Sequence, residues 1–141
     1  MTTIAYRDGV LASDSSCWEG DIKTCSVRKI FRVRGALVGF TGNLNHGMRF
    51  LDWVRDGAHH DEIPRGNYTG IVVSKSGSVT TYDNGEAAVI LRGKYFAFGN
   101  GQDVALGAMH AGANARRAVM AAIEHSAKTD GPIRILRIKH D

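Results

Sequence analysis

The sequence contains few cysteines and no long hydrophobic run. Its two cysteines, Cys17 and Cys25, form no C-x-x-C pair and therefore indicate no metal site. The sequence does not decide whether the two form a disulfide, although a reducing cytoplasm favours free thiols. No segment approaches the roughly 18 consecutive apolar residues that a membrane-spanning helix requires, and the N-terminus lacks the basic segment and apolar run of a signal peptide. We therefore expect a cytoplasmic protein that does not enter the membrane.

Excess charge is also small. The 141 residues include 18 lysines and arginines against 14 aspartates and glutamates, which gives a net charge of +4 at pH 7. Positive charge concentrates in residues 23–34 and 134–139, but neither segment interleaves aromatic residues in a nucleic-acid-binding motif. A module that binds DNA or RNA in a salt-sensitive manner is therefore a weaker interpretation. The length and the 43% hydrophobic content predict one domain, residues 1–141.

Hydrophobic patterns and turn residues predict both strands and helices. A hairpin is expected at residues 2–15, around the turn Asp8-Gly9. Residues 44–55 predict an amphipathic helix, and the Ala-rich residues 102–127 predict two helices separated near a glycine. Further strands are expected at 22–33, 36–40, 68–74, 78–83, 87–91, 94–98 and 132–138. Strands and helices thus occur in blocks, which predicts an α+β sandwich rather than alternating βαβ units.

Thr2 is the first residue that could carry chemistry. A small residue after the initiator normally permits removal of Met1, which would give Thr2 a free α-amine beside its hydroxyl. An unperturbed α-amine titrates at about 7.7–8.0, so a sizeable fraction is neutral near physiological pH. One residue can therefore supply a nucleophile and its general base. Because many proteins begin Met-Thr without a catalytic role, this feature alone is weak.

Lys29 and Asp14 strengthen the catalytic interpretation. If residues 25–33 form one strand, Lys29 shares a face with four apolar residues, Cys25, Val27, Phe31 and Val33. An ammonium in such a row must be paired or must extend into solvent. Asp14 follows a short strand, and an ion pair would hold Lys29 near Thr2, where the cation favours the ionised hydroxyl. The alternative is an aspartate that only opens the loop 13–16.

Two glycine-containing segments could present backbone N–H groups. Residues 39–43, Gly-Phe-Thr-Gly-Asn, could donate to an oxyanion, although a simple strand-to-helix turn explains them equally well. Residues 99–101, Gly-Asn-Gly, precede a helix, but the dinucleotide-binding pattern G-x-G-x-x-G fails at Val104. The run His59-His60-Asp61-Glu62 is interpreted as a solvated loop, because no complementary ligands accompany it. The sequence therefore predicts no metal and no cofactor.

Taken in order, these residues resemble the proteasome β-subunit family and its bacterial HslV-like branch, including small bacterial or phage-encoded members. The matching features are Thr2, Asp14, Lys29, the Gly-Phe-Thr-Gly segment at 39–42, and Gly-Asn-Gly at 99–101 before the Ala-rich helix pair. The resemblance covers nearly the whole chain. It implies an N-terminal nucleophile (Ntn) hydrolase with a four-layer αββα sandwich. The short segment before Tyr68 implies a reduced helix layer.

The resemblance also implies a role for each matched residue. Thr2 would be the nucleophile and, through its amine, the base. Lys29 would tune the nucleophile, Asp14 would orient Lys29, and the Gly42 N–H would stabilise the oxyanion. Three further residues, Cys17, Val27 and Asn43, would shape the substrate pocket.

Two positions depart from the family pattern. Asn100 stands where the family commonly has serine; it could support the amine through hydrogen bonds, but it cannot act as a hydroxyl shuttle. Ser126 aligns with a family aspartate and Thr129 with a following serine, while a shifted alignment would use the carboxylate of Asp130.

These features predict a threonine peptidase that cleaves peptide bonds through an acyl-enzyme within a homo-oligomeric ring. An ATPase unfoldase is a possible partner. A small-amide hydrolase with the same nucleophile is the second interpretation, which an open cleft in a monomer or dimer would favour. A catalytically silent scaffold subunit is the third, because of Asn100 and Ser126.

Overall fold

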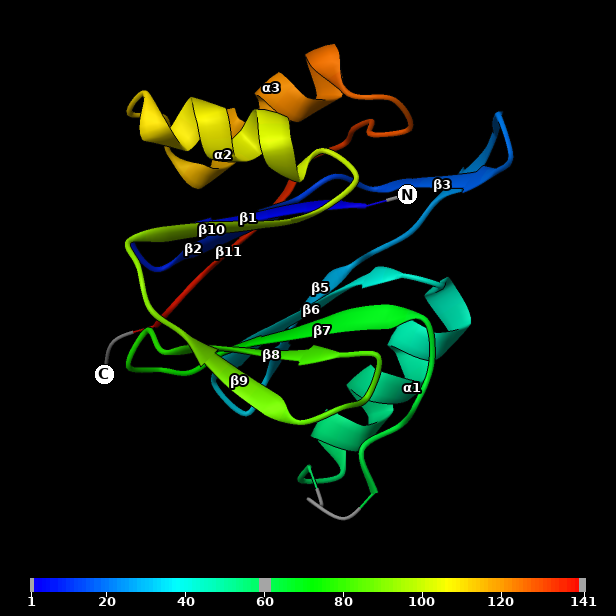
Figure 1. Ribbon diagram of the computed structural model, residues 1–141, viewed down its shortest axis with the longest axis vertical. Coiled ribbons are helices and arrows are strands. Elements are labelled where there is room, and N and C mark those ends of the chain that lie inside the picture. The colour runs from blue at the N-terminus through cyan, green and yellow to red at the C-terminus, as the bar shows by residue number, and fades with distance from the viewer. Residues whose placement is uncertain (1, 59–61, 140–141) are drawn as a thin grey trace.

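The computed structural model describes residues 2–58 and 62–139. Met1 and residues 59–61 lie outside this range, so the predicted removal of Met1 and the predicted loop at His59-His60-Asp61 are not tested. The described chain forms two larger antiparallel sheets, a two-stranded ribbon and three helices (Figure 1). The α+β class predicted from the sequence is confirmed.

The first sheet places the N-terminal strand at its centre. Its strand order is β10-β1-β2-β11, with β1 at Thr3–Arg7, β2 at Val10–Ser13, β10 at Tyr95–Gly99 and β11 at Arg134–Arg137. The turn at Asp8-Gly9 has positive φ at both residues, 51° and 78°, as a type I′ hairpin requires. Because β1 has a strand on each side, the residues at its beginning are held from both directions.

The second sheet has five strands in the order β5-β6-β7-β8-β9. Their bounds are β5 Ile30–Val33, β6 Ala36–Gly42, β7 Tyr68–Val73, β8 Val79–Asp83 and β9 Ala88–Leu91. Consecutive strands are neighbours, which gives a simple antiparallel meander. A second two-residue turn, Arg34-Gly35, again with positive φ at both positions, joins β5 to β6.

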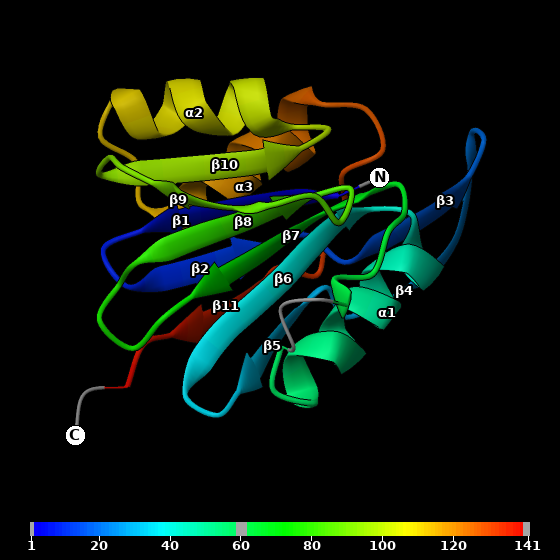
Figure 2. The same cartoon turned by 60° about the horizontal axis from the view of Figure 1, so that its bottom comes forward.

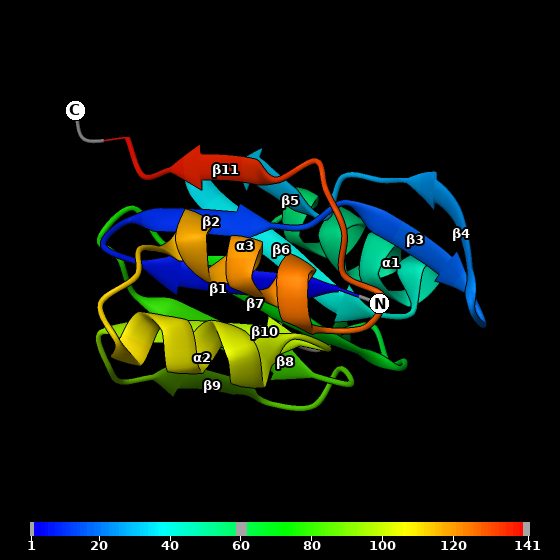
Figure 3. The ribbon, with the colours of Figure 1, turned by 90° about the horizontal axis from the view of Figure 1, so that it is seen from above.

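The two sheets pack face to face, and helices cover their outer faces (Figure 2). The residues buried between the sheets include Ile4, Leu11, Ile30, Leu37, Ile71, Val73 and Val79. Helices α2 (Gln102–His110) and α3 (Ala115–His125) lie side by side over the first sheet, as the view from above shows (Figure 3). Helix α1 (Leu44–Arg55) is the helix of the described chain that covers the second sheet.

The two sheet–helix interfaces differ in side-chain size. Small residues dominate the interface between the first sheet and helices α2 and α3: Ala5 and Ala12 from the sheet, and Ala105, Ala115 and Ala118 from the helices. Aromatic rings dominate beneath α1, where the ring centroid of Phe50 lies 5.4 Å from that of Tyr68 and 5.3 Å from that of Tyr82. The small residues allow α3 to approach the first sheet closely, whereas the rings fill the wider space under α1.

The helices follow the sequence prediction closely. The first spans residues 44–55 as expected, and the Asn43 side chain caps it by accepting a hydrogen bond from the His46 N–H at 3.1 Å. The expected break falls between α2 and α3, where Gly112 has φ of 106° and ends the helix in a conformation that glycine favours. None of the described helices is long and apolar enough to span a bilayer.

The prediction of one strand over residues 22–33 is wrong. Strand β4 (Ile22–Ser26) ends before Val27 and pairs with β3 (Ser16–Glu19), a strand that the sequence analysis placed partly in a loop. Residues 27–29 belong to no strand, because the Val27 N–H donates to the Ser15 carbonyl at 2.9 Å and the chain crosses from the ribbon to β5. The single strand on which the alternation around Lys29 was predicted is therefore interrupted, although within β5 the alternation holds: Ile30 packs between the sheets, whereas Phe31 and Val33 face α1.

The contact between α1 and β6 gives the first testable prediction. A Cβ on Gly47 of α1 would overlap the ring of the buried Phe40, whereas a Cβ on Gly107 of α2 would have no heavy atom within 4 Å. We expect Gly47→Ala to lower the free energy of unfolding by about 1–3 kcal/mol. The matched variant Gly107→Ala should raise it by about 0.5–1 kcal/mol through helix propensity. Urea denaturation measures both, and equal effects would contradict the close packing at Gly47.

Candidate active site

Thr2 lies at the start of the central strand of the first sheet, with 6% of its surface exposed. Its carbonyl accepts a hydrogen bond from the Asn100 N–H at 2.7 Å. Gly99 has φ of 95°, and a Cβ there would overlap the Thr2 carbonyl. The glycine therefore permits the close approach of two backbones that fixes Thr2.

The Asp14 carboxylate is fully buried and accepts hydrogen bonds through both oxygens. Its Oδ1 accepts from the Thr3 N–H at 2.9 Å and from the Lys29 ammonium at 3.1 Å. Its Oδ2 accepts from the Ser16 hydroxyl at 2.8 Å, and from the N–H groups of Ser16 and Asp130, each at 3.3 Å. Asp14 thus joins β1, the start of β3, the segment before β5 and the segment before β11.

Lys29 is 3% exposed and forms the ion pair with Asp14 that the sequence analysis expects. Burial lowers the pKa of Lys29 from its usual value, and the Asp14 charge and hydrogen bond counteract part of that shift. The paired carboxylate offsets the cost of burying the ammonium. The role of Lys29 in tuning a nucleophile stays a prediction.

Gly42 ends β6 with φ of 101° and presents its N–H away from β7. Successive N–H groups of an antiparallel strand point to opposite sides, and the neighbouring Asn43 N–H donates to β7, at 2.8 Å from the Asn67 carbonyl. On the other side, the described ladder ends where the Phe40 N–H meets the Lys29 carbonyl at 3.4 Å, because the chain before Lys29 turns away. The Gly42 N–H is therefore available to a ligand at the end of the sheet.

Two cavities meet at Thr2 and Gly42, and these two residues line both cavities. The first cavity, of about 280 Å³, also contains Lys29 and the three predicted substrate-pocket residues, Cys17, Val27 and Asn43. Its remaining lining is mainly apolar, from Trp18, Phe40 and Leu44. The structure thus brings six of the predicted site residues into one cavity; Asp14 lies directly behind Lys29.

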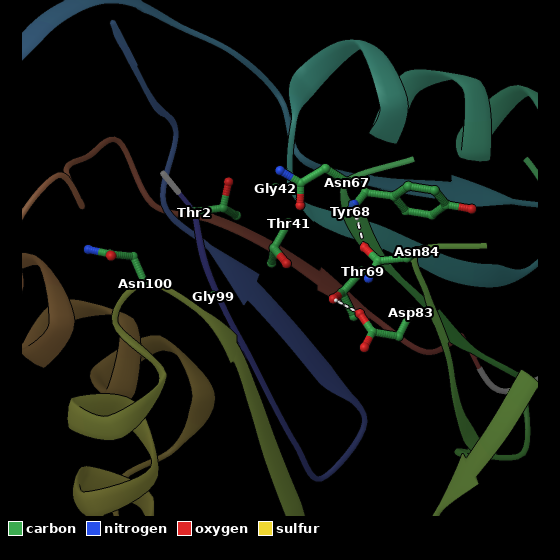
Figure 4. A pocket seen from close by; sticks show the side chains of 10 residues that line it. All are labelled: Thr2, Thr41, Gly42, Asn67, Tyr68, Thr69, Asp83, Asn84, Gly99 and Asn100. Carbon is green, nitrogen blue, oxygen red and sulfur yellow. Dashed lines mark hydrogen bonds between the residues drawn. The ribbon is translucent and has the colours of Figure 1, made fainter. Parts of the chain in front are cut away.

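The second cavity, of about 380 Å³, lies on another side of Thr2 and is lined mainly by residues of polar types (Figure 4). Strand ends and turns supply its lining: Thr41, Asn67, Thr69, Asp83, Asn84, Gly99 and Asn100. Thus Thr2 stands between a cavity that contains a lysine and a cavity that contains a carboxylate.

The loop after α3 meets the site mainly through its backbone. The Asn100 side chain donates to the Ala127 carbonyl, and the Lys128 carbonyl accepts from the Ser16 hydroxyl at 3.2 Å. The Thr129 and Thr3 hydroxyls lie 3.0 Å apart. These contacts anchor the loop beside β1 and place Thr129 near the site.

Ser126 and the Asp130 carboxylate are not brought into either cavity. Ser126 ends α3, where its N–H donates to the Ala122 carbonyl at 2.8 Å. The Asp130 carboxylate pairs with Lys23 at 2.6 Å, and this hydrogen bond holds the pKa of Asp130 below its usual value. The shifted alignment that would use the Asp130 carboxylate is therefore not supported; it is the backbone N–H of Asp130 that reaches Asp14.

Sequence reasoning missed part of the buried polar network. Thr3 is fully buried: its hydroxyl accepts from the Gly101 N–H at 3.0 Å and contacts Thr129. Ser16, also fully buried, donates to Asp14. A threonine within the otherwise apolar start of β1 was the available signal for Thr3. The partners of Ser16 lie more than a hundred residues away or in an irregular segment, so no local pattern indicates it.

Comparison with known proteins identifies the fold. No protein-family model and no curated protein matches the chain. Among solved structures, it is similar to Thiobacillus denitrificans BPH, with 19% identity and a TM-score of 0.69, and to the same protein in a complex with epoxomicin, with 21% identity and a TM-score of 0.69; each comparison covers 99% of both chains. It is also similar to eukaryotic HslV from Trypanosoma brucei, with 17% identity and a TM-score of 0.77, over 98% of this chain and 99% of the other. The chain therefore has the fold of HslV.

The buried ion pair gives the second testable prediction. Asp14→Asn removes the charge that compensates Lys29, so we expect the free energy of unfolding to fall by about 3–5 kcal/mol. In Lys29→Met, Asp14 keeps its four other hydrogen bonds, and the loss should be clearly smaller. Denaturant titration of both variants at one pH measures the two losses in the free energy of unfolding and shows which is larger. A loss in Asp14→Asn that does not exceed the loss in Lys29→Met would contradict it.

Proposed function

We propose that this chain, which has the HslV fold, is a threonine peptidase whose nucleophile is Thr2 after removal of Met1. One observation carries the proposal: Thr2 and the buried Lys29 line one cavity, and Asp14 holds the lysine by an ion pair at 3.1 Å. A hydroxyl, a cation and a backbone donor such as the Gly42 N–H are the groups that acyl transfer requires.

In the proposed acylation step, the Thr2 hydroxyl oxygen attacks the carbonyl carbon of a peptide bond. Its proton passes to the neutral α-amine of the same residue. The charge that develops on the carbonyl oxygen is stabilised by the Gly42 N–H. The C–N bond then breaks, the α-ammonium returns the proton to the leaving amine, and the acyl group remains as an ester on Thr2.

Deacylation repeats these steps with water. The α-amine takes a proton from a water molecule, and the resulting hydroxide attacks the ester carbon. The carboxylic acid departs, and the proton returns to the Thr2 oxygen. The amine must therefore be free, so a retained Met1 would prevent catalysis.

Lys29 supports these steps through its charge. A cation beside the hydroxyl stabilises the alkoxide character of the attacking oxygen and favours the neutral form of a nearby amine. Asp14 positions Lys29 but lines neither cavity, and its own hydrogen bonds come from four separate segments. We assign it a positioning role.

The proposal includes the setting that the family resemblance implies. The chain would be a single domain with an αββα arrangement that assembles into a homo-oligomeric ring in the cytoplasm. Peptides or unfolded chains would be the substrates, and their side chain before the scissile bond would enter the cavity lined by Cys17, Val27 and Asn43. An ATPase unfoldase would be the partner of such a ring.

One observation favours a catalytically silent subunit as the second candidate. The Asn100 side chain, which stands at the family's serine position, donates to the Ala127 carbonyl, and Ser126 lines neither cavity. A silent subunit would keep the fold and the Asp14–Lys29 pair but would not need Met1 to be removed. A small-amide hydrolase would use the same nucleophile and differ in substrate size.

A peptide epoxyketone tests the proposal directly. This reagent reacts with both the hydroxyl and the free amine of an N-terminal threonine; epoxomicin, present in one structure of this fold, is the probe we would use. We expect the intact mass to show loss of Met1 and one covalent adduct per chain. Thr2→Ala should give no adduct, whereas Thr2→Ser, which keeps a hydroxyl and an amine, should still react.

The same experiment separates the alternatives. A retained Met1 in the purified protein would contradict the proposal and favour the silent subunit. Loss of Met1 without an adduct, combined with no cleavage of unfolded protein, would also favour it. An adduct together with hydrolysis of small amides but not of peptides would favour the amidase.

A further inference from the structure

The cavity of about 380 Å³ beside Thr2 contains a row of three side chains. The strand register pairs Thr41 of β6 with Thr69 of β7, and Thr69 with Asp83 of β8. Residues directly opposite one another in antiparallel strands point to the same face. Leu37, Ile71 and Val79 share that face farther along the same strands and lie in the core between the sheets. At the end near Thr2, this apolar face therefore becomes a polar wall.

This row extends away from Thr2. A Cβ on Gly99, the residue packed against the Thr2 carbonyl, would lie 3.2 Å from the Thr41 methyl group, so Thr41 is the member nearest the nucleophile. Neighbouring strands are about 4.8 Å apart, which places Asp83 about 10 Å beyond Thr41. Figure 4 shows Thr41 between Thr2 and the pair formed by Thr69 and Asp83.

Among the described residues that line this cavity, Asp83 carries the only carboxylate, and none is a lysine or arginine. Its Oδ1 accepts a hydrogen bond from the Thr69 hydroxyl at 3.0 Å. Within the described part of the chain, no basic side chain forms an ion pair with it. In a protein with a net charge of +4, this wall thus presents an isolated negative charge to a ligand.

The other cavity at Thr2 is occupied, in the proposed function, by the side chain before the scissile bond. A nucleophile that attacks a peptide carbonyl has the acyl portion of the substrate on one side and the leaving portion on the other. The cavity with Asp83 borders Thr2 and Gly42 as well, and it extends from them along a different set of strand ends. It is therefore available to the leaving portion.

We propose that this cavity binds the residue that follows the scissile bond and that Asp83 selects a basic side chain there. The inference rests on the proposed peptidase function and specifies its substrate class. An extended lysine or arginine side chain is the kind that reaches from the residue after the scissile bond toward the distant carboxylate, and the Thr41 and Thr69 hydroxyls flank its path. Thr69 fixes the orientation of the carboxylate through its hydrogen bond.

The solvent exposure of Asp83 determines how strongly the cavity prefers a basic side chain. Asp83 is exposed, so its attraction for a cation is screened by water, and an exposed pair changes an equilibrium by about two- to fivefold. Glutamate at the same substrate position meets a like charge and should be disfavoured by a similar factor. Added salt should reduce both effects, because exposed charges are screened.

Internally quenched peptides test this inference. One series has a constant sequence before the scissile bond and lysine, glutamine or glutamate directly after it, and mass spectrometry verifies the cleaved bond. For the wild-type protein we expect kcat/KM to decrease in the order lysine, glutamine, glutamate, with about two- to fivefold per step. In Asp83→Asn, which keeps an acceptor for Thr69, the ratios should approach one.

Glu86→Gln is the matched control. Glu86 is exposed in the turn after β8 and carries the same charge, but it does not line the cavity, so its removal should leave the wild-type ratios in place. Equal kcat/KM for the three peptides, or equal loss of the preference in both variants, would overturn the inference. Epoxyketone labelling separates this from failure of the proposed function, because the probe has no leaving residue: an adduct with equal ratios refutes only the subsite, whereas no adduct and no cleavage refute the peptidase.

Discussion

The ion pair between Asp14 and Lys29 constrains the rest of the site, because burying a charge without a partner is costly. The carboxylate lies at 0% exposure and the lysine at 3%, and Asp14 also accepts hydrogen bonds from the surrounding backbone. These come from the start of β1, the start of β3 and the loop before β11. Segments that are far apart in the sequence are thereby fixed around Thr2, so a structural ion pair helps to position the proposed nucleophile.

The location of Thr2 also follows from how the two sheets end. Apolar side chains fill the space between them along most of their length, but at this end the second sheet carries Thr41, Thr69 and Asp83. Strand β5 begins only at Ile30, so the edge of β6 near Gly42 has no neighbouring strand in the described chain. Cavities form where close packing and strand pairing both stop. Thr2, directly before β1, lies at this end of the sheets.

The fold was largely predictable because its signals are local. Asp8-Gly9 and Arg34-Gly35 determine hairpins through their own backbone preferences, and the period of residues 44–55 identifies α1. The pairing of Asp14 with Lys29 could be predicted from the sequence, because a charge within an apolar row needs a partner. The break at Val27 was not predictable, since a hydrogen bond to Ser15 and the distant requirement to reach Asp14 override the strand pattern. Ser126 lies outside both cavities for a related reason: an alignment gives its position in the sequence but not the path of the loop.

Backbone groups supply many of the hydrogen bonds at this site, in a fold that the chain shares with solved structures at 17–21% identity. Asp14 accepts from the N–H groups of Thr3, Ser16 and Asp130, and the proposed oxyanion donor is the N–H of Gly42. A backbone donor stays in place when its side chain changes, provided that the chain keeps its course. Asp130 can thus pair its carboxylate with Lys23 while its N–H supports Asp14. Thr2, Asp14, Ser16, Lys29 and the glycines at close approaches act through their own side chains or through the lack of one, so substitutions at the other positions that line the cavities can change which ligands fit without disturbing this framework.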